Sequence, residues 1–255
     1  MRLLLLSDIH ANLEALEACM DAAPEFDKIV NLGDVVGYNA SPNEVCERVR
    51  AMGGMVVRGN HDRACAGLSD LSEFNLIAAM SARWTQTALA PEHIAWLREL
   101  QQGPLRMEAL PGIEFVHGSP RGEDEYLLSA PTATLDFNAS EHIDVVFFGH
   151  THLQGGFTYN GGHPLYFTPQ YEVGKGVLHC TMRLLARERY LINPGSVGQP
   201  RDNDWRAAFA LYESDVGFPG TVTFYRVPYD VQAAQARVLA ANLPERLATR
   251  LALGR

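Results

Sequence analysis

The chain has 255 residues, of which 47% are hydrophobic and 20% charged, and its formal net charge is −9. This length allows a sizeable core, and the composition argues against disorder. No run of lysine and arginine is present, so a nucleic-acid polymer is an unlikely partner; small anionic substrates stay open because bound metals can reverse the local sign of an acidic protein.

The first sixty residues alternate short apolar runs with helical patterns. Three runs are predicted to be buried strands because polar residues stop each of them; they are Leu3–Leu6, Lys28–Leu32 and Met55–Val57. Asn12 can cap a helix that runs to about Ala22, and Ser41-Pro42 opens a second helix. Strands that alternate with helices indicate a mainly parallel sheet, and its strand ends deliver polar residues to one edge.

The middle of the chain is expected to be helical from about Leu71 to Leu100 and then to return to strands at Ile113–Val116 and Val145–Phe148. Residues 155–189 contain clustered glycines and broken apolar alternation. This composition predicts a hairpin and an irregular excursion, which is either a lid or surface decoration.

The last sixty residues end the fold with a regular pattern. Tyr190–Ile192 is predicted to be a strand, and Ala208–Tyr212 and Thr221–Val227 alternate like an antiparallel hairpin. Asp230 can cap a final helix to about Ala241, before a short basic tail. Without an internal repeat or a linker, residues 1–255 are predicted to form a single domain.

The chain carries no pattern of an exported or membrane protein. Four leucines at Leu3–Leu6 are too few for a signal peptide or a membrane span, and Asp8 and His10 follow at once. The four cysteines form no CxxC pair and are expected to be reduced thiols. We therefore expect a soluble, cytoplasmic protein without a membrane contact.

Five of the nine histidines directly follow predicted strands. These five are His10, His61, His117, His150 and His152, whereas His93, His142, His163 and His179 lie in ordinary helical or loop contexts. Asp8 and His10 are two residues apart in extended backbone, so their side chains project to the same side. A carboxylate beside an imidazole suits a divalent metal, but taken alone this pair is a weak signal that is more typical of a polar turn.

The remaining motifs add further metal-binding groups. Gly33-Asp34 places a carboxylate after a buried strand, where Asp34 can bridge two cations or simply cap the next helix. Asn60 offers an amide oxygen, and His61 can be a ligand or a proton donor. With His117 and the His150-x-His152 pair, four ligands could reach each of two metals if one carboxylate is shared.

In this order, the motifs resemble the calcineurin-like metallophosphoesterase superfamily. The matching stretches are Asp8-x-His10, Gly33-Asp34, Gly59-Asn60-His61-Asp62, His117 and Gly149-His150-Thr151-His152. The stretch Asn193–Arg201, with the sequence NPGSVGQPR, is similar to a branch of small bacterial and archaeal phosphodiesterase-like members.

The resemblance implies an α/β fold, a four-layer α/β/β/α sandwich with two mixed β-sheets and with the metals at the sheet edges. It implies two ligand sets, one of Asp8, His10, Asp34 and His152, and the other of Asp34, Asn60, His117 and His150. His61 then lies outside the metal shell, free to hydrogen-bond a phosphate oxygen or to protonate the leaving group. A hydroxide between the metals would attack phosphorus in line.

One position departs from the family pattern. Many members carry an aspartate where this chain has Gly37, and that aspartate commonly orients the histidine that corresponds to His61. The role of His61 as an acid is therefore weaker here. A good leaving group, such as an aryl oxide or a nucleotide phosphate, needs an acid least.

Three arginines adjoin the motifs, namely Arg58, Arg121 and Arg201. Each could hold substrate phosphate through paired N–H donors or could form a surface ion pair. Tyr38 and Asn39 could contact substrate because they follow Asp34. Gly195-Ser196 is expected to be a structural turn beside the metals, not a nucleophilic site.

These observations predict a metal-dependent hydrolase of small phosphoesters or nucleotides, with phosphodiesters preferred. The alternative is a metal-binding scaffold of the same fold that holds a protein partner. A nuclease is disfavoured by charge, and a dinucleoside polyphosphate hydrolase or a protein phosphatase would differ only in what lines the mouth of the site. Mixed nitrogen and oxygen ligands suit manganese, with Fe, Co, Ni and Zn also possible.

Overall fold

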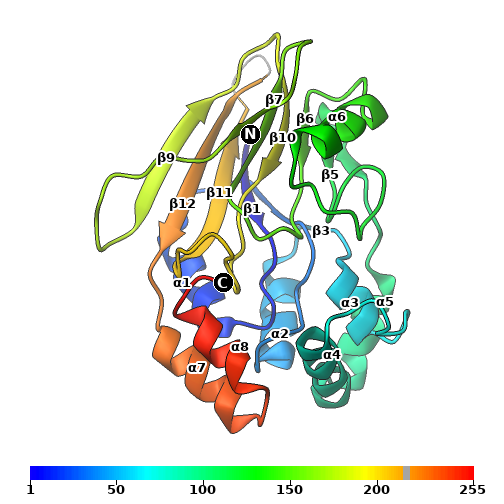
Figure 1. Ribbon diagram of the computed structural model, residues 1–255, viewed down its shortest axis with the longest axis vertical. Helices are drawn as coiled ribbons and strands as arrows, with labels where there is room; N and C mark the ends of the chain where they lie inside the picture. The colour runs from blue at the N-terminus through cyan, green and yellow to red at the C-terminus, as the bar shows by residue number, and fades with distance from the viewer. Residues whose placement is uncertain (215–218) are drawn as a thin grey trace.

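Two six-stranded β-sheets pack face to face in the computed structural model, which describes residues 1–214 and 219–255 (Figure 1). The first sheet has the order β3-β2-β1-β11-β12-β9. Its strands are β1 (Arg2–Leu6), β2 (Lys28–Asn31), β3 (Met55–Val56), β9 (Leu178–Arg183), β11 (Ala207–Glu213) and β12 (Thr221–Val227). β1, β2 and β3 run parallel, whereas β11, β12 and β9 add antiparallel pairs, so this sheet is mixed.

The second sheet has the order β4-β5-β6-β10-β7-β8. Its strands are β4 (Leu105–Met107), β5 (Leu110–Phe115), β6 (Val145–Phe147), β7 (Gly155–Tyr159), β8 (Leu165–Phe167) and β10 (Arg189–Asn193). β5, β6 and β10 are parallel, and the outer strands are antiparallel. Both sheets therefore end their central parallel strands at the same side of the molecule, which is where the polar motifs follow.

The packing of the β1 leucines explains why the sequence of that strand is a continuous apolar run. Leu3 and Leu5 lie in the apolar layer between the two sheets, and Leu4 and Leu6 face the helices on the other side. All four are fully buried. A strand buried on both faces needs apolar residues at every position, so the prediction of a buried strand is confirmed.

Helices cover the outer faces of both sheets. They are α1 (Leu13–Ala22), α2 (Pro42–Met52), α3 (Asn60–Cys65), α4 (Leu76–Ala88), α5 (Pro91–Glu99), α6 (Ala130–Ala139), α7 (Val231–Ala240) and α8 (Glu245–Leu251). α1 and α2 bury their apolar residues against the first sheet, and α6 packs on β7 and β10 of the second (Figure 1). This arrangement confirms the α/β/β/α sandwich with two mixed sheets.

Several elements differ from the predictions. Residues 71–75 form turns, and α4 begins only after Asn75, whose side chain caps it by accepting from the Ala78 N–H at 3.0 Å. α6 was not predicted because its β-branched threonines hide its helical character; Ser129 caps it and Phe137 anchors it. The expected basic tail contains α8, which buries Leu247 and Leu251.

Residues 155–189 are more regular than expected. β7 and β8 form the predicted hairpin, but β9 joins the edge of the first sheet beside β12. The side chains of β9 alternate between half-buried and exposed because an edge strand packs on one face only. Because this one-sided pattern lies between glycine-rich turns, the sequence of residues 155–189 predicted an irregular segment instead of a strand at β9.

Two further expectations concern the chain as a whole. All four cysteines are free, with Cys19, Cys46 and Cys65 buried. Within residues 1–214 and 219–255, no helix combines the length and the apolar character needed to cross a bilayer.

Candidate metal centre

The structure brings the seven predicted ligands together in the loops that follow the parallel strands of both sheets. Asp8 and His10 follow β1, Asp34 follows β2, Asn60 begins α3, His117 follows β5, and His150 and His152 follow β6. Two groups have ligand atoms within 4.8 Å of one another, namely Asp8, His10, Asp34 and His152, and Asp34, His117 and His150. Asn60 Oδ1 lies 3.1 Å from His117 Nε2, beside the second group.

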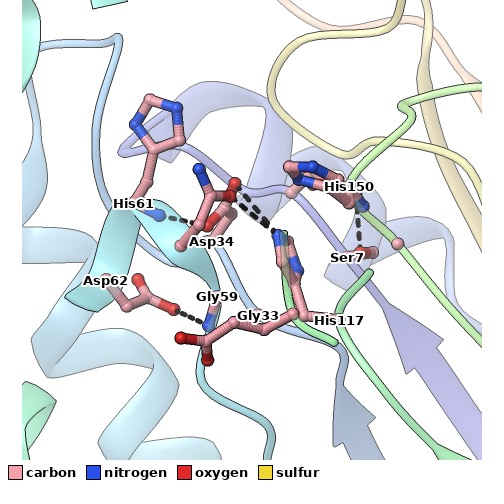
Figure 2. Close-up of polar contacts among 12 residues, drawn as sticks. Ser7, Gly33, Asp34, Gly59, His61, Asp62, His117 and His150 are labelled. Carbon is pink, nitrogen blue, oxygen red and sulfur yellow. Dashed lines mark hydrogen bonds and ion pairs between the residues drawn. The ribbon is translucent and has the colours of Figure 1, made fainter. Parts of the chain in front are cut away.

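Asp34 is shared by the two groups. Its Oδ2 lies 3.4 Å from Nε2 of His10 and 3.4 Å from Nε2 of His117. Its Oδ1 accepts the main-chain N–H of His61 at 2.9 Å, which fixes the carboxylate plane. Figure 2 shows the Asp34 side chain between His61 and His117. One carboxylate oxygen thus faces both groups, as a bridging ligand requires.

The imidazole rings are held in one tautomer. Nδ1 of His10 lies 3.0 Å from the Val36 carbonyl, and Nδ1 of His117 lies 2.8 Å from the Leu32 carbonyl. Nδ1 of His152 is 2.5 Å from the Gln199 carbonyl. A carbonyl can only accept, so each Nδ1 carries the proton, and the lone pair of a neutral ring is on Nε2. Such main-chain partners orient metal-binding histidines.

The donor set fits divalent cations. Nε2 of His10 and Nε2 of His152 face each other at 3.1 Å, and burial holds the pKa of both rings well below the usual range. Two neutral rings with protons on Nδ1 would direct two lone pairs at each other, and only a cation between them makes both contacts favourable. Nε2 of His150 is buried without a hydrogen-bond partner among the described residues.

The charges of the buried groups also favour a cation. Burial alone would raise the pKa of Asp34, but His117 and His61 outweigh it and hold that pKa well below its usual value. Burial would lower the pKa of His117, yet Asp34 raises it to about 10. Burial raises the pKa of Asp8 to about 7, and the charge of Asp34 adds to this shift. The space between Asp34 and His117 therefore favours positive charge.

The backbone of the centre is strained. Left-handed φ values occur at five of the predicted ligands, which are Asp8 (52°), His10 (48°), Asp34 (55°), His150 (63°) and His152 (59°). This conformation is unfavourable for residues other than glycine, and it tends to persist at functional sites where the surroundings enforce it. The turns direct neighbouring side chains into a small volume that regular strands could not reach.

The stretch after β10 supports the first group from behind. Ser196 Oγ donates to the Asp8 carbonyl at 2.8 Å, and Gln199 N–H donates to Ser196 Oγ at 2.8 Å. Asn39 Nδ2 donates to the His10 carbonyl at 2.8 Å. Ser196 thus has the place of the structural turn predicted at Gly195-Ser196, and Asn39 is a buried support rather than a residue facing substrate.

His61 lies beside the ligands and against aromatic rings. Its ring centroid is 4.8 Å from that of His10, 4.4 Å from Tyr38 and 4.8 Å from Phe74. Its Nδ1 is buried and has no hydrogen-bond partner among the described residues. Burial lowers its pKa to about 4. The carboxylate of Asp62 points elsewhere and accepts from the main-chain N–H groups of Val36 and Gly59. Figure 2 shows its contact with Gly59.

Gly37 occupies the position where many family members carry aspartate. Its φ is +92°, and a Cβ at this position would lie 2.5 Å from His61 Nδ1. The ring of His61 therefore fills the space in which a side chain at Gly37 would begin. Aromatic packing by Tyr38 and Phe74 orients His61 here in place of a carboxylate.

The three predicted arginines have different surroundings. Arg58 pairs with the buried Glu123 at 3.1 Å, and Arg121 pairs with the buried Asp136 at 2.7 Å, as in the ion-pair alternative. Arg201 forms no such pair among the described residues. Its Nη2 donates to Tyr38 Oη at 3.3 Å. Burial lowers the pKa of four neighbouring histidines, and the charge of Arg201 adds to this lowering.

Two aromatic residues at the centre were not predicted. Tyr126 packs on His150 with ring centroids 4.0 Å apart, and Phe74 packs on His61. Both lie in segments without a motif, so no sequence signal marked them. They line a cleft of about 460 Å³ that is also lined by Asn60, His61 and His150.

Known proteins are similar to this chain over most of its length. The model of the calcineurin-like phosphoesterase superfamily domain matches residues 1–216. An uncharacterized protein of Methanocaldococcus jannaschii is 35% identical over 258 residues, covering 98% of this chain and 97% of that protein.

Solved structures share the architecture. The crystal structure of a metallophosphoesterase from Sphaerobacter thermophilus is 39% identical, with a TM-score of 0.82 over 100% of this chain and 99% of that chain. A hypothetical protein of Pyrococcus horikoshii is 21% identical, with a TM-score of 0.76 over 100% of this chain and 98% of that chain, a likeness that concerns the fold alone.

Proposed function

The chain belongs to the calcineurin-like phosphoesterase superfamily, and from this premise we propose that it is a hydrolase of small phosphodiesters that uses two divalent cations. The similar chain from Sphaerobacter thermophilus is described as a metallophosphoesterase. The observation that carries the proposal is the position of Asp34 Oδ2, 3.4 Å from Nε2 of both His10 and His117.

We assign the ligands to two overlapping sets. Asp8, His10, Asp34 and His152 would hold one cation, and Asp34, Asn60, His117 and His150 the other. When bound, such a pair lowers the pKa of water to about 7 and stabilises charge that develops on the phosphate oxygens. Mixed imidazole and oxygen donors suit Mn²⁺, which we propose as the ion, with Fe, Co, Ni or Zn as substitutes.

His61 acts on the substrate as a hydrogen-bond donor. Burial keeps its ring neutral at neutral pH, and cations in the adjacent sites would lower its pKa further. A neutral imidazole donates one N–H to a phosphate oxygen but supplies little acid to the leaving group. The site therefore favours phosphodiesters whose leaving group departs without a proton.

Arg201 supplies a fixed positive charge beside the proposed metal site. Its main-chain N–H donates to the His152 carbonyl at 3.2 Å, and its guanidinium lies over the Tyr38 ring, with Cζ 5.9 Å from the ring centroid. This placement would let the guanidinium hold a non-bridging oxygen of the substrate phosphate.

The direct test uses protein stripped with a chelator and supplied with Mn²⁺. We expect turnover of bis-p-nitrophenyl phosphate to exceed that of p-nitrophenyl phosphate and to disappear without the metal.

Two variants test the ligand and the donor separately. Asp34→Asn should abolish turnover and also abolish binding of a second Mn²⁺, measured by titration calorimetry. Asp136→Asn removes a buried carboxylate outside the centre and should preserve both turnover and Mn²⁺ binding. His61→Ala should reduce kcat by about 10²- to 10³-fold, the effect of losing one transition-state donor, while Mn²⁺ binding stays intact.

The same measurements separate the enzyme from the scaffold alternative. The missing carboxylate at Gly37 favours a scaffold, whereas the retained His61, 4.8 Å from His10 between ring centroids, favours an enzyme. Binding of two Mn²⁺ without turnover of either compound would support the scaffold. Full activity of Asp34→Asn would refute the shared-ligand centre.

A further inference from the structure

A second pocket adjoins the metal centre at Tyr38 and Tyr126. It has a volume of about 930 Å³ and shares these two residues and Asn75 with the cleft that is lined by His61 and His150. Four arginines line it, namely Arg201, Arg246, Arg250 and Arg255, together with Leu76, Ile77, Thr249 and Leu253. No acidic residue belongs to this lining, although the whole chain carries a net charge of −9.

The arginines of this pocket have no aspartate or glutamate partner, although Arg250 Nε donates to the main-chain oxygen of Arg255, the last residue of the sequence. Across residues 1–214 and 219–255, no Asp or Glu side chain lies within ion-pair distance of any of the four, whereas Arg58, Arg63 and Arg121 are all paired. Arg201 and Arg250 both lie over the Tyr38 ring, with Cζ 5.9 Å and 5.7 Å from its centroid. Four guanidinium groups that line one pocket without an acidic side chain favour binding of an anion there.

Two details of Arg201 and Arg250 favour an anionic ligand at this pocket. The Nε of Arg201 is buried and has no hydrogen-bond partner among the described residues. Burial, and then the charge of Arg201, lowers the pKa of Arg250 to about 10. A guanidinium whose positive charge is disfavoured by its surroundings binds phosphate with less loss of solvation than an exposed one.

The cleft that contains His61 has the opposite charge from the pocket that the four arginines line. The cleft beside His61 is lined by Asp70, Glu73 and Asp124, and its one arginine, Arg63, is paired with Asp124 at 3.0 Å. The second anionic group of a substrate would be repelled from this cleft and attracted to the pocket lined by Arg201, Arg246, Arg250 and Arg255, hereafter the arginine pocket. The opposite charges of the cleft and the arginine pocket thus fix the direction in which such a substrate lies across the proposed metal sites.

Building on the proposed function, we propose that the arginine pocket binds a second phosphate of the substrate. The preferred substrate class is then a phosphodiester that carries a further phosphate group on the side held by Arg246 and Arg250. Arg201, between the pocket and the metal centre, contacts the scissile phosphate, and the other arginines select the remote one.

A matched pair of chromogenic substrates tests the proposal. Thymidine 5′-(4-nitrophenyl phosphate) and its 3′-phosphorylated form have the same scissile bond and leaving group and differ by one phosphate. With the Mn²⁺-loaded full chain at low salt, we expect at least about a tenfold higher kcat/KM for the 3′-phosphorylated form, mostly through KM, as for one charged hydrogen bond. Arg246→Gln and the double variant Arg246→Gln/Arg250→Gln should bring the ratio of the two kcat/KM values toward one.

The control removes the same charge elsewhere. Arg187 is exposed in the turn before β10, so Arg187→Gln should keep the ratio of the parent protein. Arg246 is exposed as well, so its single variant should fold normally, as checked by its melting temperature. A ratio near one in the parent protein, or a ratio that neither pocket variant changes, would overturn the second-phosphate site.

A binding measurement keeps this outcome separate from the proposed function. Thymidine 3′,5′-bisphosphate is titrated calorimetrically into the parent protein, Arg246→Gln and Arg187→Gln. Weaker binding to Arg246→Gln alone supports the pocket, even if neither chromogenic compound is hydrolysed. Absence of hydrolysis would refute the enzyme, and equal binding to all three proteins would refute the pocket.

Discussion

At the scale of single residues, His61 has an unusual support. Its ring packs against the rings of Tyr38 and Phe74 and lies close to Gly37, with no carboxylate bonded to Nδ1 among the described residues. Tilted and edge-on aromatic packing fixes where the ring lies but adds no charge to it. The arrangement suits a hydrogen-bond donor better than an acid, because an acid at neutral pH needs a neighbouring carboxylate to raise its pKa.

Gly37→Asp tests this support directly. A side chain at Gly37 would start 2.5 Å from His61 Nδ1 and would have to adopt a φ of +92°. We therefore expect kcat to fall, because His61 is displaced, and stability to fall by about 1–2 kcal/mol from the left-handed backbone. Steady-state kinetics and urea unfolding measure the two effects.

Gly161→Asp is the matched control for that variant. Gly161 has a φ of +95°, and a Cβ there meets nothing within 4 Å. It should lose similar stability while kcat stays unchanged. A gain in kcat for Gly37→Asp would instead mean that an introduced carboxylate can orient His61 as an acid.

The residues of the centre differ in how far the sequence predicts them. The proposed ligands stand at strand ends in short motifs, so the spacing of Asp8 and His10 and the strand before Asp34 were enough to predict that they meet. Tyr126 and Arg250 come from segments whose positions depend on tertiary packing. Neither has a local pattern, because aromatic and arginine side chains are common on any surface.

At the scale of elements, α1 is tied to the metal centre by its cap. Asn12 Oδ1 accepts the Ala15 N–H at 3.1 Å, and its Nδ2 donates to the Gly198 carbonyl at 3.0 Å. Gly198 N–H in turn donates to the Asp8 carbonyl at 3.0 Å. One side chain thus caps a helix and holds the segment that supports Asp8.

Asn12→Ala should destabilise the protein more than loss of an ordinary cap. The cap itself contributes about 1 kcal/mol, and an unpaired buried carbonyl at Gly198 costs about 1–3 kcal/mol more. Asp230→Ala removes only the exposed cap of α7, where Asp230 accepts from Ala233 N–H at 2.9 Å. Urea unfolding of the two variants should show this difference, and equal losses would contradict the role of the Gly198 contact.

The elements themselves were predicted where their pattern is local. The continuous leucines of β1 and the caps at Asn12 and Asp230 identify a buried strand and two helix starts from a few residues. α8 was missed because its seven residues are too few for a clear helical pattern, and it is stabilised by packing of Leu247 and Ala248 in the cluster that contains Tyr38. β9 was missed because an edge strand depends on its partner β12.

At the scale of the whole molecule, the proposed ligands come from both sheets. Asp8, His10, Asp34 and Asn60 follow β1, β2 and β3 of the first sheet, and His117, His150 and His152 follow β5 and β6 of the second. The His10–His152 contact joins residues 142 positions apart. Cations at this point would connect the two halves of the sandwich at the edge where the strands end.

Removing the metal should therefore destabilise the fold. Ions that bind only the folded chain stabilise it by about 2.7 kcal/mol at a free concentration 100 times the Kd, so EDTA should lower the Tm of the Mn²⁺-loaded protein by several degrees. Amide exchange should increase most in the loops that hold His10 and His152, since these loops lose their shared partner. Asp34→Asn should show a much smaller EDTA effect than the parent, because it no longer joins the two sites, and Asp136→Asn should keep the full effect. If EDTA leaves the Tm and the exchange of both loops unchanged, the cations do not bridge the two sheets.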